Sequence, residues 1–478
     1  MKTELNDYPD SKTPRYEKLA ARFRENIMNN VWPAGTKIPS KRILAKMYAE
    51  SEDVVLNACH MLFREHLLVT RNRKGTYVTG LLLEDEIKRN LTSEPNYDYE
   101  DFSEPDRKLW RPAKRTAIRL DLSSPEPDAR LLDKLRKCYI SRKATSCTSD
   151  ITAVKEAIVE CVRPSLIHRD IALDARQICL TEGEFTILHH IASLLRENEG
   201  EFIVVPAFVN PMVVRMIRSA GLNVMQIDLN SYDQFFQSLS TAAYAHRVKG
   251  VFLETRCDGG TGIMFPEAGR EALLGLARTC RFPIVEIDYD YEFSYRPFRL
   301  LFADAPDIVI YVSCISKLTH SMYDVKYAAG PAEVIRSLRH LSESCSRAAE
   351  CRLMAIKRVI EQPGMEEAAR LRAERCREAA VLLKKQLCNS LKNRIDVFLP
   401  DAGTGMFLYM PPATDGQMLK QLLYKDNIYI KSPALRVIDG VERMVLKLDY
   451  SNIDAAQAET VAPRFITAFR KSAPYSDL

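Results

Sequence analysis

Five short apolar runs, separated by segments with helical periodicity, place the strongest constraint on how this chain can fold. They lie at residues 202–205, 224–227, 250–253, 283–287 and 308–312. Strands that are buried on both faces of a sheet read as continuous apolar runs of this length, and such sheets are mostly parallel. The runs therefore predict an α/β fold with a mostly parallel central sheet. Functional side chains are then expected at the carboxyl ends of these strands.

Length and composition agree with a folded protein of more than one domain. The chain has 478 residues, of which 46% are hydrophobic and 27% charged, so it can bury a large core over two or three domains. The sequence contains no run of roughly 18 uncharged apolar residues, and its start lacks the apolar segment of a signal peptide. We therefore expect a cytoplasmic protein without membrane contact. Its 12 scattered cysteines are expected to be reduced thiols.

Positive charge is concentrated near the amino terminus. Residues 1–80 hold 14 Lys and Arg against 9 Asp and Glu, whereas residues 81–478 hold equal numbers of basic and acidic residues. The whole formal excess of +5 therefore lies in the first sixth of the chain. This asymmetry is expected if that segment binds a polyanion such as nucleic acid.

The same segment has the pattern of three helices. Residues 15–32 carry apolar side chains at helical spacing and are followed by Pro33, which predicts an amphipathic helix. Ser40 is the predicted N-cap of a second helix over 41–49, and Ser51 that of a third. Two short helices joined by a tight turn indicate a helix-turn-helix.

Residues 67–78 then predict a β-hairpin, a wing with cations at its tip. Together with the helices, this segment resembles the winged helix-turn-helix of GntR-type transcription regulators. The resemblance rests on Pro33-Ala34-Gly35-Thr36-Lys37-Ile38-Pro39-Ser40-Lys41-Arg42-Ile43-Leu44-Ala45 and Lys74-Gly75-Thr76-Tyr77-Val78. It implies binding to double-stranded DNA, with the third helix in the major groove and cations on the phosphates. The residues expected to contact DNA are Lys41, Arg42, Ser51, Glu52, Arg71, Arg73, Lys74 and Tyr77.

The start of the recognition helix departs from the GntR pattern. The family usually opens this helix with Ser-Arg, whereas this chain has Ser51-Glu52-Asp53-Val54. Two acids there would face the phosphates. Either Glu52 accepts a hydrogen bond from a cytosine amino group, or the affinity for DNA is weak and depends on a dimer.

A linker separates this head from a larger domain. Residues 81–118 are acidic and contain several prolines, which predicts part helix and part extended chain. We therefore divide the chain into a winged-helix domain at 1–80, a linker at 81–118 and a domain at 119–478. The large part of that domain is expected at about 119–335 and its small carboxyl-terminal part at about 336–478.

Polar clusters at the strand ends of the larger domain follow an order that resembles fold-type I aminotransferases, which depend on pyridoxal 5'-phosphate (PLP). They are Thr181-Glu182-Gly183-Glu184, Pro206-Ala207-Phe208, Thr261-Gly262, Glu286-Ile287-Asp288-Tyr289-Asp290-Tyr291-Glu292-Phe293 and Ser316-Lys317. Joined to a GntR-type head, this domain makes the chain similar to the MocR family of chimeric regulators over nearly its whole length. The resemblance implies a homodimer that brings two winged helices onto repeated half-sites.

The MocR resemblance also implies a site for PLP. The lysine that forms the Schiff base maps to Lys317, and this chemistry needs a desolvated amine. The candidate cofactor-binding residues are Lys317, Asp288, Tyr289, Phe208, Gly183 and Ser316, and the candidate effector-binding residue is Lys447. No histidine has the spacing to cysteine or glutamate that a metal site needs, so no metal is expected.

The positions that would hold the cofactor have changed in this chain. Ile287 stands where the family places the aspartate for the pyridine nitrogen, and without that carboxylate the ring fails as an electron sink. Asp324 stands where the family has an arginine for the phosphate, and Lys326 is the nearest compensating cation. Phe208 lacks the hydroxyl of the usual tyrosine, and Lys447 replaces a bidentate arginine. The family's His-Gln-aromatic-Pro has become Cys257-Asp258-Gly259-Gly260.

These changes favour a transcription regulator over an enzyme. In this interpretation the larger domain has no catalytic residues, dimerises and senses an unidentified small molecule. The alternative is an active PLP-dependent aminotransferase with a regulatory head. A third possibility is a domain that serves only for dimerisation or takes a different ligand. The regulator hypothesis leaves both a cofactor-bound and a cofactor-free form open.

The charge asymmetry generates a prediction about the wing. Changing Arg71, Arg73 and Lys74 together to Ala should weaken DNA binding and flatten its salt dependence, because each phosphate contact contributes about 0.9 to the slope of log K against log salt. Gel-shift titrations at several salt concentrations measure both quantities. An unchanged affinity and slope would contradict the assignment of the wing.

Overall fold

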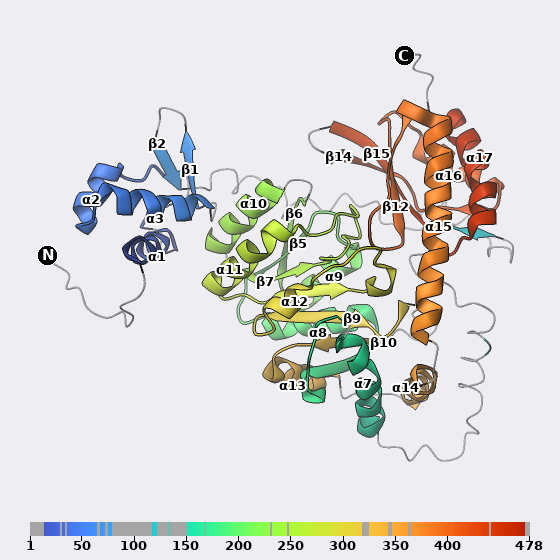
Figure 1. Cartoon of the computed structure of the whole chain (residues 1–478), viewed down its shortest axis with the longest axis horizontal. Helices are drawn as coiled ribbons and strands as arrows, with labels where there is room; N and C mark the ends of the chain where they lie inside the picture. Colours follow the sequence, from blue (N-terminus) through green and yellow to red (C-terminus); the bar gives the residue numbers. More distant parts are fainter. Residues whose placement is uncertain are drawn as a thin grey trace.

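Figure 1 shows a computed structural model of the chain. The structure describes residues 14–28, 31–33, 36–64, 67–71, 75–78, 117–121, 133, 151–167, 169–229, 232–245, 248–317, 325–342, 347–361, 365–438 and 441–473. The head, the domain with the central sheet and the carboxyl-terminal part follow one another along the longest axis of the molecule (Figure 1).

Three helices and a hairpin form the head. They are α1 (Arg15–Met28), α2 (Lys41–Tyr48), α3 (Glu52–Arg64), β1 (Leu68–Arg71) and β2 (Gly75–Val78), with the two strands antiparallel. Their apolar faces share one core, in which the ring centroid of Phe23 lies 5.1 Å from that of Trp32 and 5.2 Å from that of Tyr48. The predicted winged helix-turn-helix is confirmed.

The helix ends of the head differ from the expectation in two places. α1 ends at Met28, before Trp32. Ser40 precedes α2 as expected, but within the described chain its side chain makes no capping hydrogen bond. At α3 the expected cap is present, because Ser51 Oγ accepts a hydrogen bond from the backbone N–H of Val54 at 3.3 Å.

A seven-stranded sheet forms the centre of the larger domain. Its strands are β4 (Ile178–Glu182), β5 (Phe202–Pro206), β6 (Asn223–Ile227), β7 (Val248–Leu253), β8 (Ile284–Asp288), β9 (Val309–Cys314) and β10 (Val325–Ala329), in the spatial order β4-β10-β9-β8-β7-β5-β6. The five predicted strands are β5 to β9, and they pair in parallel. β10 is antiparallel to both of its neighbours. The mostly parallel sheet is therefore confirmed.

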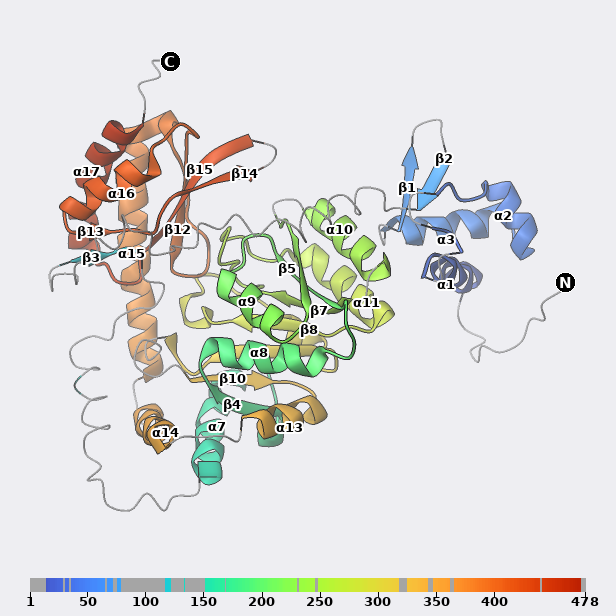
Figure 2. The same ribbon diagram turned by 180° about the vertical axis from the view of Figure 1, so that it is seen from behind.

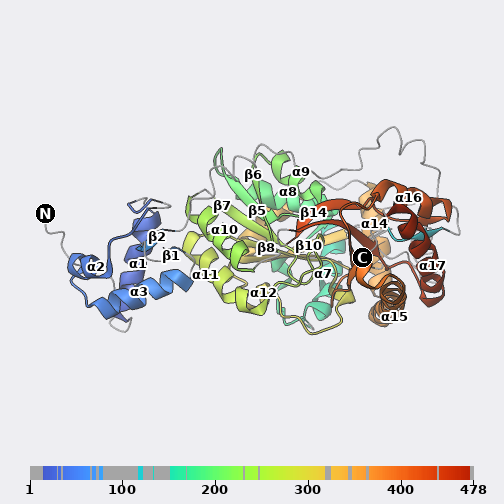
Figure 3. The ribbon, with the colours of Figure 1, turned by 90° about the horizontal axis from the view of Figure 1, so that it is seen from above.

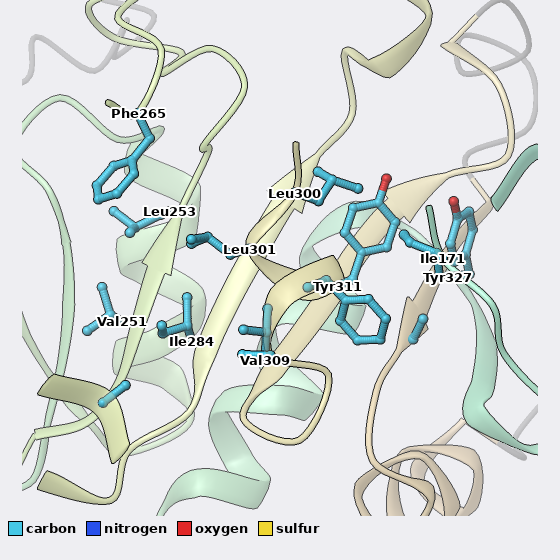
Figure 4. Close-up of a cluster of buried hydrophobic side chains, with 14 of the residues drawn as sticks. Ile171, Val251, Leu253, Phe265, Ile284, Leu300, Leu301, Val309, Tyr311 and Tyr327 are labelled. Atoms are coloured by element: carbon cyan, nitrogen blue, oxygen red, sulfur yellow. The ribbon is translucent and has the colours of Figure 1, made fainter. Parts of the chain in front are cut away.

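Helices cover both faces of this sheet (Figure 2). On one face, the first core contains residues of α7 (Ile151–Ile167), α10 (Tyr232–Ala245), α11 (Arg270–Cys280), α12 (Leu301–Asp304) and α14 (Arg347–Ile360). On the other face, the second core contains residues of α8 (Glu184–Leu195), α9 (Pro211–Ser219) and α13 (Ala332–Leu341). Because side chains alternate along a strand, Ile284 of β8 belongs to the first core (Figure 4) and Val285 to the second.

The small part is built on an antiparallel sheet. Its strands are β11 (Asp396–Phe398), β12 (Gly405–Met410), β14 (Ala434–Ile438) and β15 (Val441–Asp449), in the order β11-β12-β15-β14. The helices are α15 (Met365–Leu391), α16 (Gly416–Lys425) and α17 (Ala455–Ser472). A third core fills the space between sheet and helices.

Short elements complete the fold. β3 (Ile118–Arg119) pairs in parallel with β13 (Ile428–Tyr429) of the small part. Single turns of 3-10 helix are η1 (Ala175–Gln177), η2 (Glu267–Gly269), η3 (Tyr291–Phe293) and η5 (Lys392–Arg394). Among the residues that the structure describes, no helix has both the length and the apolar character needed to cross a membrane.

The three cores show which elements of the larger domain pack together on either side of residue 335. α13 and α14 pack in the two cores of the central sheet, whereas α15 from Ala373 onward packs in the third core, to which Phe293 of η3 also belongs. Ile118 and Leu120, which were expected in the linker and in the large part, also belong to the third core. Periodicity shows that a helix has an apolar face but not which core that face joins, so these boundaries needed the tertiary structure.

Candidate functional site

The start of α2 and the start of α3 lie close together on the head. Lys41, Arg42, Ser51 and Glu52 are all exposed there. Arg42 Nε lies 3.4 Å from Glu52 Oε1, and the two side chains are 85% and 54% exposed. Such a surface ion pair is weak and is screened by salt. Glu52 therefore places a negative charge beside the arginine that was expected on a phosphate.

The helix dipole also accounts for the acids at the start of α3. Glu52 and Asp53 occupy its first turn, where a negative charge interacts favourably with the positive end of the helix. The two acids that depart from the family pattern thus contribute to the stability of the helix.

The wing is described in part. Arg71 ends β1, whereas Arg73 and Lys74 lie outside the described residues. Tyr77 of β2 is half-buried, and its backbone forms an antiparallel β-bridge with that of Lys37. Gly75 has a φ of +112°, and a Cβ there would lie 2.5 Å from Lys37 Cε. The wing therefore requires glycine at this position.

Neighbouring side chains at the carboxyl end of β8 point to opposite faces of the sheet. Ile287 belongs to the second core, against which Tyr289 also packs. Asp288 is 2% exposed and lies on the other face, toward Arg256 and Tyr311. Because this alternation is fixed by the strand, Asp288 cannot take the position of a carboxylate at Ile287 without a shift of register.

A buried arginine neutralises Asp288. Arg256 Nε donates to Asp288 Oδ1 at 2.7 Å and Arg256 Nη2 donates to Oδ2 at 2.9 Å, which makes a bidentate pair. Tyr311 Oη also donates to Oδ2 at 2.9 Å. Burial alone would lower the pKa of Arg256, but the Asp288 carboxylate outweighs it and the pKa is raised. The Asp288 carboxylate is therefore part of a buried ionic network.

Arg169 extends this network across the sheet. Its Nη1 donates to Tyr311 Oη at 2.6 Å and its Nη2 donates to Tyr327 Oη at 2.9 Å. Figure 4 shows both tyrosines among the side chains of the first core. The guanidinium carbon of Arg169 lies 3.9 Å from the ring centroid of Tyr291, a cation–π geometry. The chain of contacts joins the segment after α7 to β9, β10 and the end of β8.

Lys317 is buried just after β9, with 7% of its surface exposed. Its ammonium group forms an ion pair with Asp290. Its backbone N–H donates to Glu292 Oε2 at 2.7 Å, and Ser316 Oγ donates to Glu292 Oε1 at 2.8 Å. Burial lowers the pKa of Lys317 to about 8, against the opposing effect of Asp449. The expected desolvated amine is present, and a carboxylate faces it.

Two cations from the small part reach the loop that follows β7. Arg436 Nη1 donates to the carbonyl oxygen of Gly260 at 2.6 Å, and Lys447 Nζ donates to that of Gly259 at 2.8 Å. The guanidinium carbon of Arg436 lies 4.3 Å from the ring centroid of Phe208. A Cβ on Gly260 would lie 2.3 Å from Phe208 Cβ, so only glycine allows this close packing. Arg436 therefore covers a face of the Phe208 ring.

The second core carries a buried lysine near the remaining candidates. Lys326 of β10 is fully buried, and its Nζ lies 4.7 Å from the ring centroid of Tyr289. Ala328, two residues further along β10, belongs to the second core, so Lys326 faces the same side of the sheet as Ile287. Gly183 is the N-cap residue of α8, with a φ of +85°. Asp324 lies outside the described residues.

Sequence reasoning missed Arg256 and Arg436. Arg256 follows β7 closely and its partner Asp288 ends the adjacent strand β8, so opposite charges at neighbouring strand ends were a usable signal. Arg436 contacts a carbonyl that lies 176 positions away in the chain. No local pattern indicates a contact of that kind.

Comparisons with known proteins agree with this geometry. Residues 140–464, more than half of the chain, match the family model described as aminotransferase class I and II. The chain belongs to this family. Its head, residues 15–78, matches the model of bacterial regulatory proteins of the gntR family. The combination confirms the resemblance to MocR-type regulators, and the aminotransferase class I and II fold implies PLP binding in the family.

Two relatives of the chain are described as regulators. The HTH-type transcriptional regulator TauR of Rhodobacter capsulatus is 23% identical over 489 residues, which cover 97% of this chain and 98% of the relative. The uncharacterized HTH-type transcriptional regulator YdfD of Bacillus subtilis (strain 168) is 22% identical over 339 residues, which cover 68% of this chain and 70% of the relative.

Solved aminotransferases share the fold of the larger domain. An archaeal alanine:glyoxylate aminotransferase has a TM-score of 0.65 at 16% identity, over 82% of this chain and 96% of that one. The alpha-aminoadipate aminotransferase LysN of Thermus thermophilus, solved in complex with N-(5'-phosphopyridoxyl)-L-leucine, has a TM-score of 0.61 at 14% identity, over 81% of this chain and 97% of that one. At such identities the likeness concerns the fold.

The buried pair generates a prediction about stability. Asp288→Asn should lower the free energy of unfolding by about 3–5 kcal/mol, because it leaves the buried charge of Arg256 without its counter-ion. Urea denaturation followed by circular dichroism measures the change. Asp307→Asn is the matched control: it removes an exposed partner of Arg278 and should leave stability nearly unchanged. An Asp288→Asn variant as stable as this control would contradict the role of the pair.

Proposed function

We propose that this protein is a DNA-binding transcription regulator whose aminotransferase-like domain dimerises and senses a small molecule. The observation that carries the proposal is the combination of a GntR-type head with a cofactor-type site in which buried Ile287 replaces the carboxylate for the ring nitrogen. A winged helix-turn-helix of this kind serves to bind DNA. A site without that carboxylate has lost the group on which transamination chemistry depends.

In the proposed complex with DNA, α3 enters the major groove and the wing lies on the backbone. Lys41, Arg42, Arg71, Arg73 and Lys74 would contact phosphates. Ser51, Glu52 and Tyr77 complete the proposed contact surface. Their support is the exposure of Lys41, Arg42, Ser51 and Glu52 on one side of the head and the match of residues 15–78 to the gntR family.

The proposed regulator is a homodimer. Two heads on one assembly would bind two half-sites together and so compensate for a weak contact by each. A second half-site is needed here because Glu52 forms an ion pair with Arg42, which was expected to contact a phosphate. A relative that is aligned over 97% of the chain is described as an HTH-type transcriptional regulator, which supports the same assignment.

We further propose that the cofactor-type site has lost catalytic PLP chemistry. Asp288 is paired with Arg256 on the opposite face from Ile287, and Arg436 covers a face of the Phe208 ring. Lys317, the residue aligned with the Schiff-base lysine, faces Asp290. The residues present do not fit PLP as an enzyme holds it, so Gly183, Ser316 and Tyr289 keep their positions without a catalytic role.

The DNA assignment is tested by selecting duplexes from a random library with the full-length protein. The expected result is an enriched pair of half-sites with a fixed spacing, and a library without enrichment would contradict a sequence-specific regulator. Glu52→Gln, assayed in parallel, should raise non-specific affinity about two- to fivefold because it releases Arg42. If the variant instead loses a cytosine preference in the enriched half-sites, Glu52 reads a base.

The loss of the cofactor is tested by adding PLP to the purified protein. We expect neither the visible absorption of a covalent lysine adduct nor, after borohydride reduction and peptide mass analysis, a modified Lys317. The test includes pH 7 and pH 9, because a lysine whose pKa is lowered to about 8 is mostly charged at the first and mostly neutral at the second. If no PLP adduct forms at pH 9, protonation of Lys317 is therefore not the reason.

A variant that restores the missing PLP-binding groups tests the same proposal in the opposite direction. Ile287→Asp combined with Asp324→Arg restores the ring partner and the phosphate partner, so this variant should bind PLP. Adding Arg436→Ala should strengthen binding further by uncovering the Phe208 ring. Tight PLP binding by the unmodified protein, with an adduct on Lys317, would contradict the proposed loss.

A further inference from the structure

Tyr244 joins two hydrophobic cores that belong to different domains. The residue lies near the carboxyl end of α10, is half-buried, and packs against the first core of the central sheet. It also packs against the core of the head, whose other members all come from residues 19–78. Among the residues that the structure describes in its four cores, Tyr244 is the one side chain that packs against two of them. This side chain therefore links the head to the larger domain.

The helices around Tyr244 meet at the same place. α1 of the head contacts α10, and Figures 1 and 3 show α10 beside the head. α10 is in turn anchored to the sheet, because its residues Phe235, Phe236 and Leu239 are buried in the first core. The position of the head is therefore tied to the central sheet as long as Tyr244 stays packed.

The contact with α10 leaves the proposed DNA-binding surface uncovered. Lys41, Arg42, Ser51 and Glu52 are all exposed while the head packs against Tyr244. The contact therefore does not compete with DNA for these residues. A docked head has one orientation relative to the central sheet, whereas a released head has the range that the connecting chain allows.

The length of the connecting chain makes this contact important. Residues 79–116 separate Val78 of β2 from the next described residue, a distance of 38 residues along the chain. A flexible chain of that length has a root-mean-square span of about 34 Å, which is about one turn of the DNA double helix. Two heads that were held by such chains alone would reach half-sites at many spacings. A fixed spacing needs a further contact that restrains each head.

From these contacts we propose that Tyr244 sets the spacing of the half-sites that the protein binds, because it holds the head against α10. The inference rests on the DNA-binding function and the homodimer proposed above. In that homodimer the two central sheets keep a constant distance, so two docked heads present α3 at one separation and one rotation. Tethering places each head near α10 at a millimolar effective concentration. A contact that would be weak between separate molecules therefore keeps the head docked.

The spacing is tested by gel shift with the full-length protein and a pair of half-sites enriched from the random library. Five base pairs inserted between the half-sites turn one of them by about half a helical turn. This insertion should weaken binding by the unmodified protein at least about tenfold, because the second head no longer reaches its half-site. For Tyr244→Ala the same insertion should weaken binding less than about threefold. An equal loss for both proteins would overturn the proposal.

Two control variants separate the packing of the ring from a general loss of stability. Tyr244→Phe keeps the ring, so it should show the same loss on insertion as the unmodified protein. Gln237→Ala changes an exposed residue of the same helix and should also behave like the unmodified protein. At low salt, all three variants should keep the affinity for a single half-site, because the head is unchanged. A loss of that affinity in Tyr244→Ala would refute a role in spacing.

Small-angle X-ray scattering without DNA measures the docking of the head directly. Tyr244→Phe and Gln237→Ala should have the maximum dimension of the unmodified protein. Tyr244→Ala should have one that is larger by about 10–30 Å, because only the connecting chain then restrains the head. Identical scattering of Tyr244→Ala and the unmodified protein would show that Tyr244 does not dock the head. If the unmodified protein selects no duplex at all, the proposed function is refuted, and the scattering still decides the docking.

Discussion

The bidentate ion pair between Arg256 and Asp288 is the constraint on which the larger domain depends. It joins the ends of two adjacent parallel strands, β7 and β8, inside the first core. A buried charge without its partner is strongly unfavourable, so the pair holds Asp288 on that face of the sheet. Because side chains alternate along a strand, the same pair holds Ile287 on the opposite face. A shift of β8 by one residue would leave the buried charge of Arg256 without its carboxylate partner, so this register is unfavourable.

This register explains why the other changes in the cofactor-type site are compatible with a stable fold. Ile287 packs in the second core, and charged side chains of the site make contacts within the chain. Lys317 faces Asp290, and Arg436 stacks on Phe208 while it binds the carbonyl of Gly260. Each of these contacts stabilises buried or half-buried polar groups that would otherwise be costly. The domain thus keeps the aminotransferase fold while its polar groups serve to hold the two parts together.

Much of the fold could be predicted because its signals are local. The helices of the head and the strands β5 to β9 follow from apolar periodicity, and Ser51 follows from its capping chemistry. One local expectation was wrong, and packing against distant neighbours could not be predicted. Ser40 has the right position, but among the described residues its side chain makes no capping hydrogen bond. The boundary near 335 stays a prediction, and which core a helix such as α14 joins depends on residues far away in the chain.

The sequence by itself determined the two-part organisation and the parallel sheet, because each depends on residue type and spacing along the chain. Only the tertiary structure decided what the charged side chains do. The pairing of Asp288 with Arg256, the cover of Phe208 by Arg436 and the packing of Tyr244 against the head each join residues from separate elements. Such contacts depend on how helices and sheets pack in three dimensions, and spacing along the chain carries no information about them.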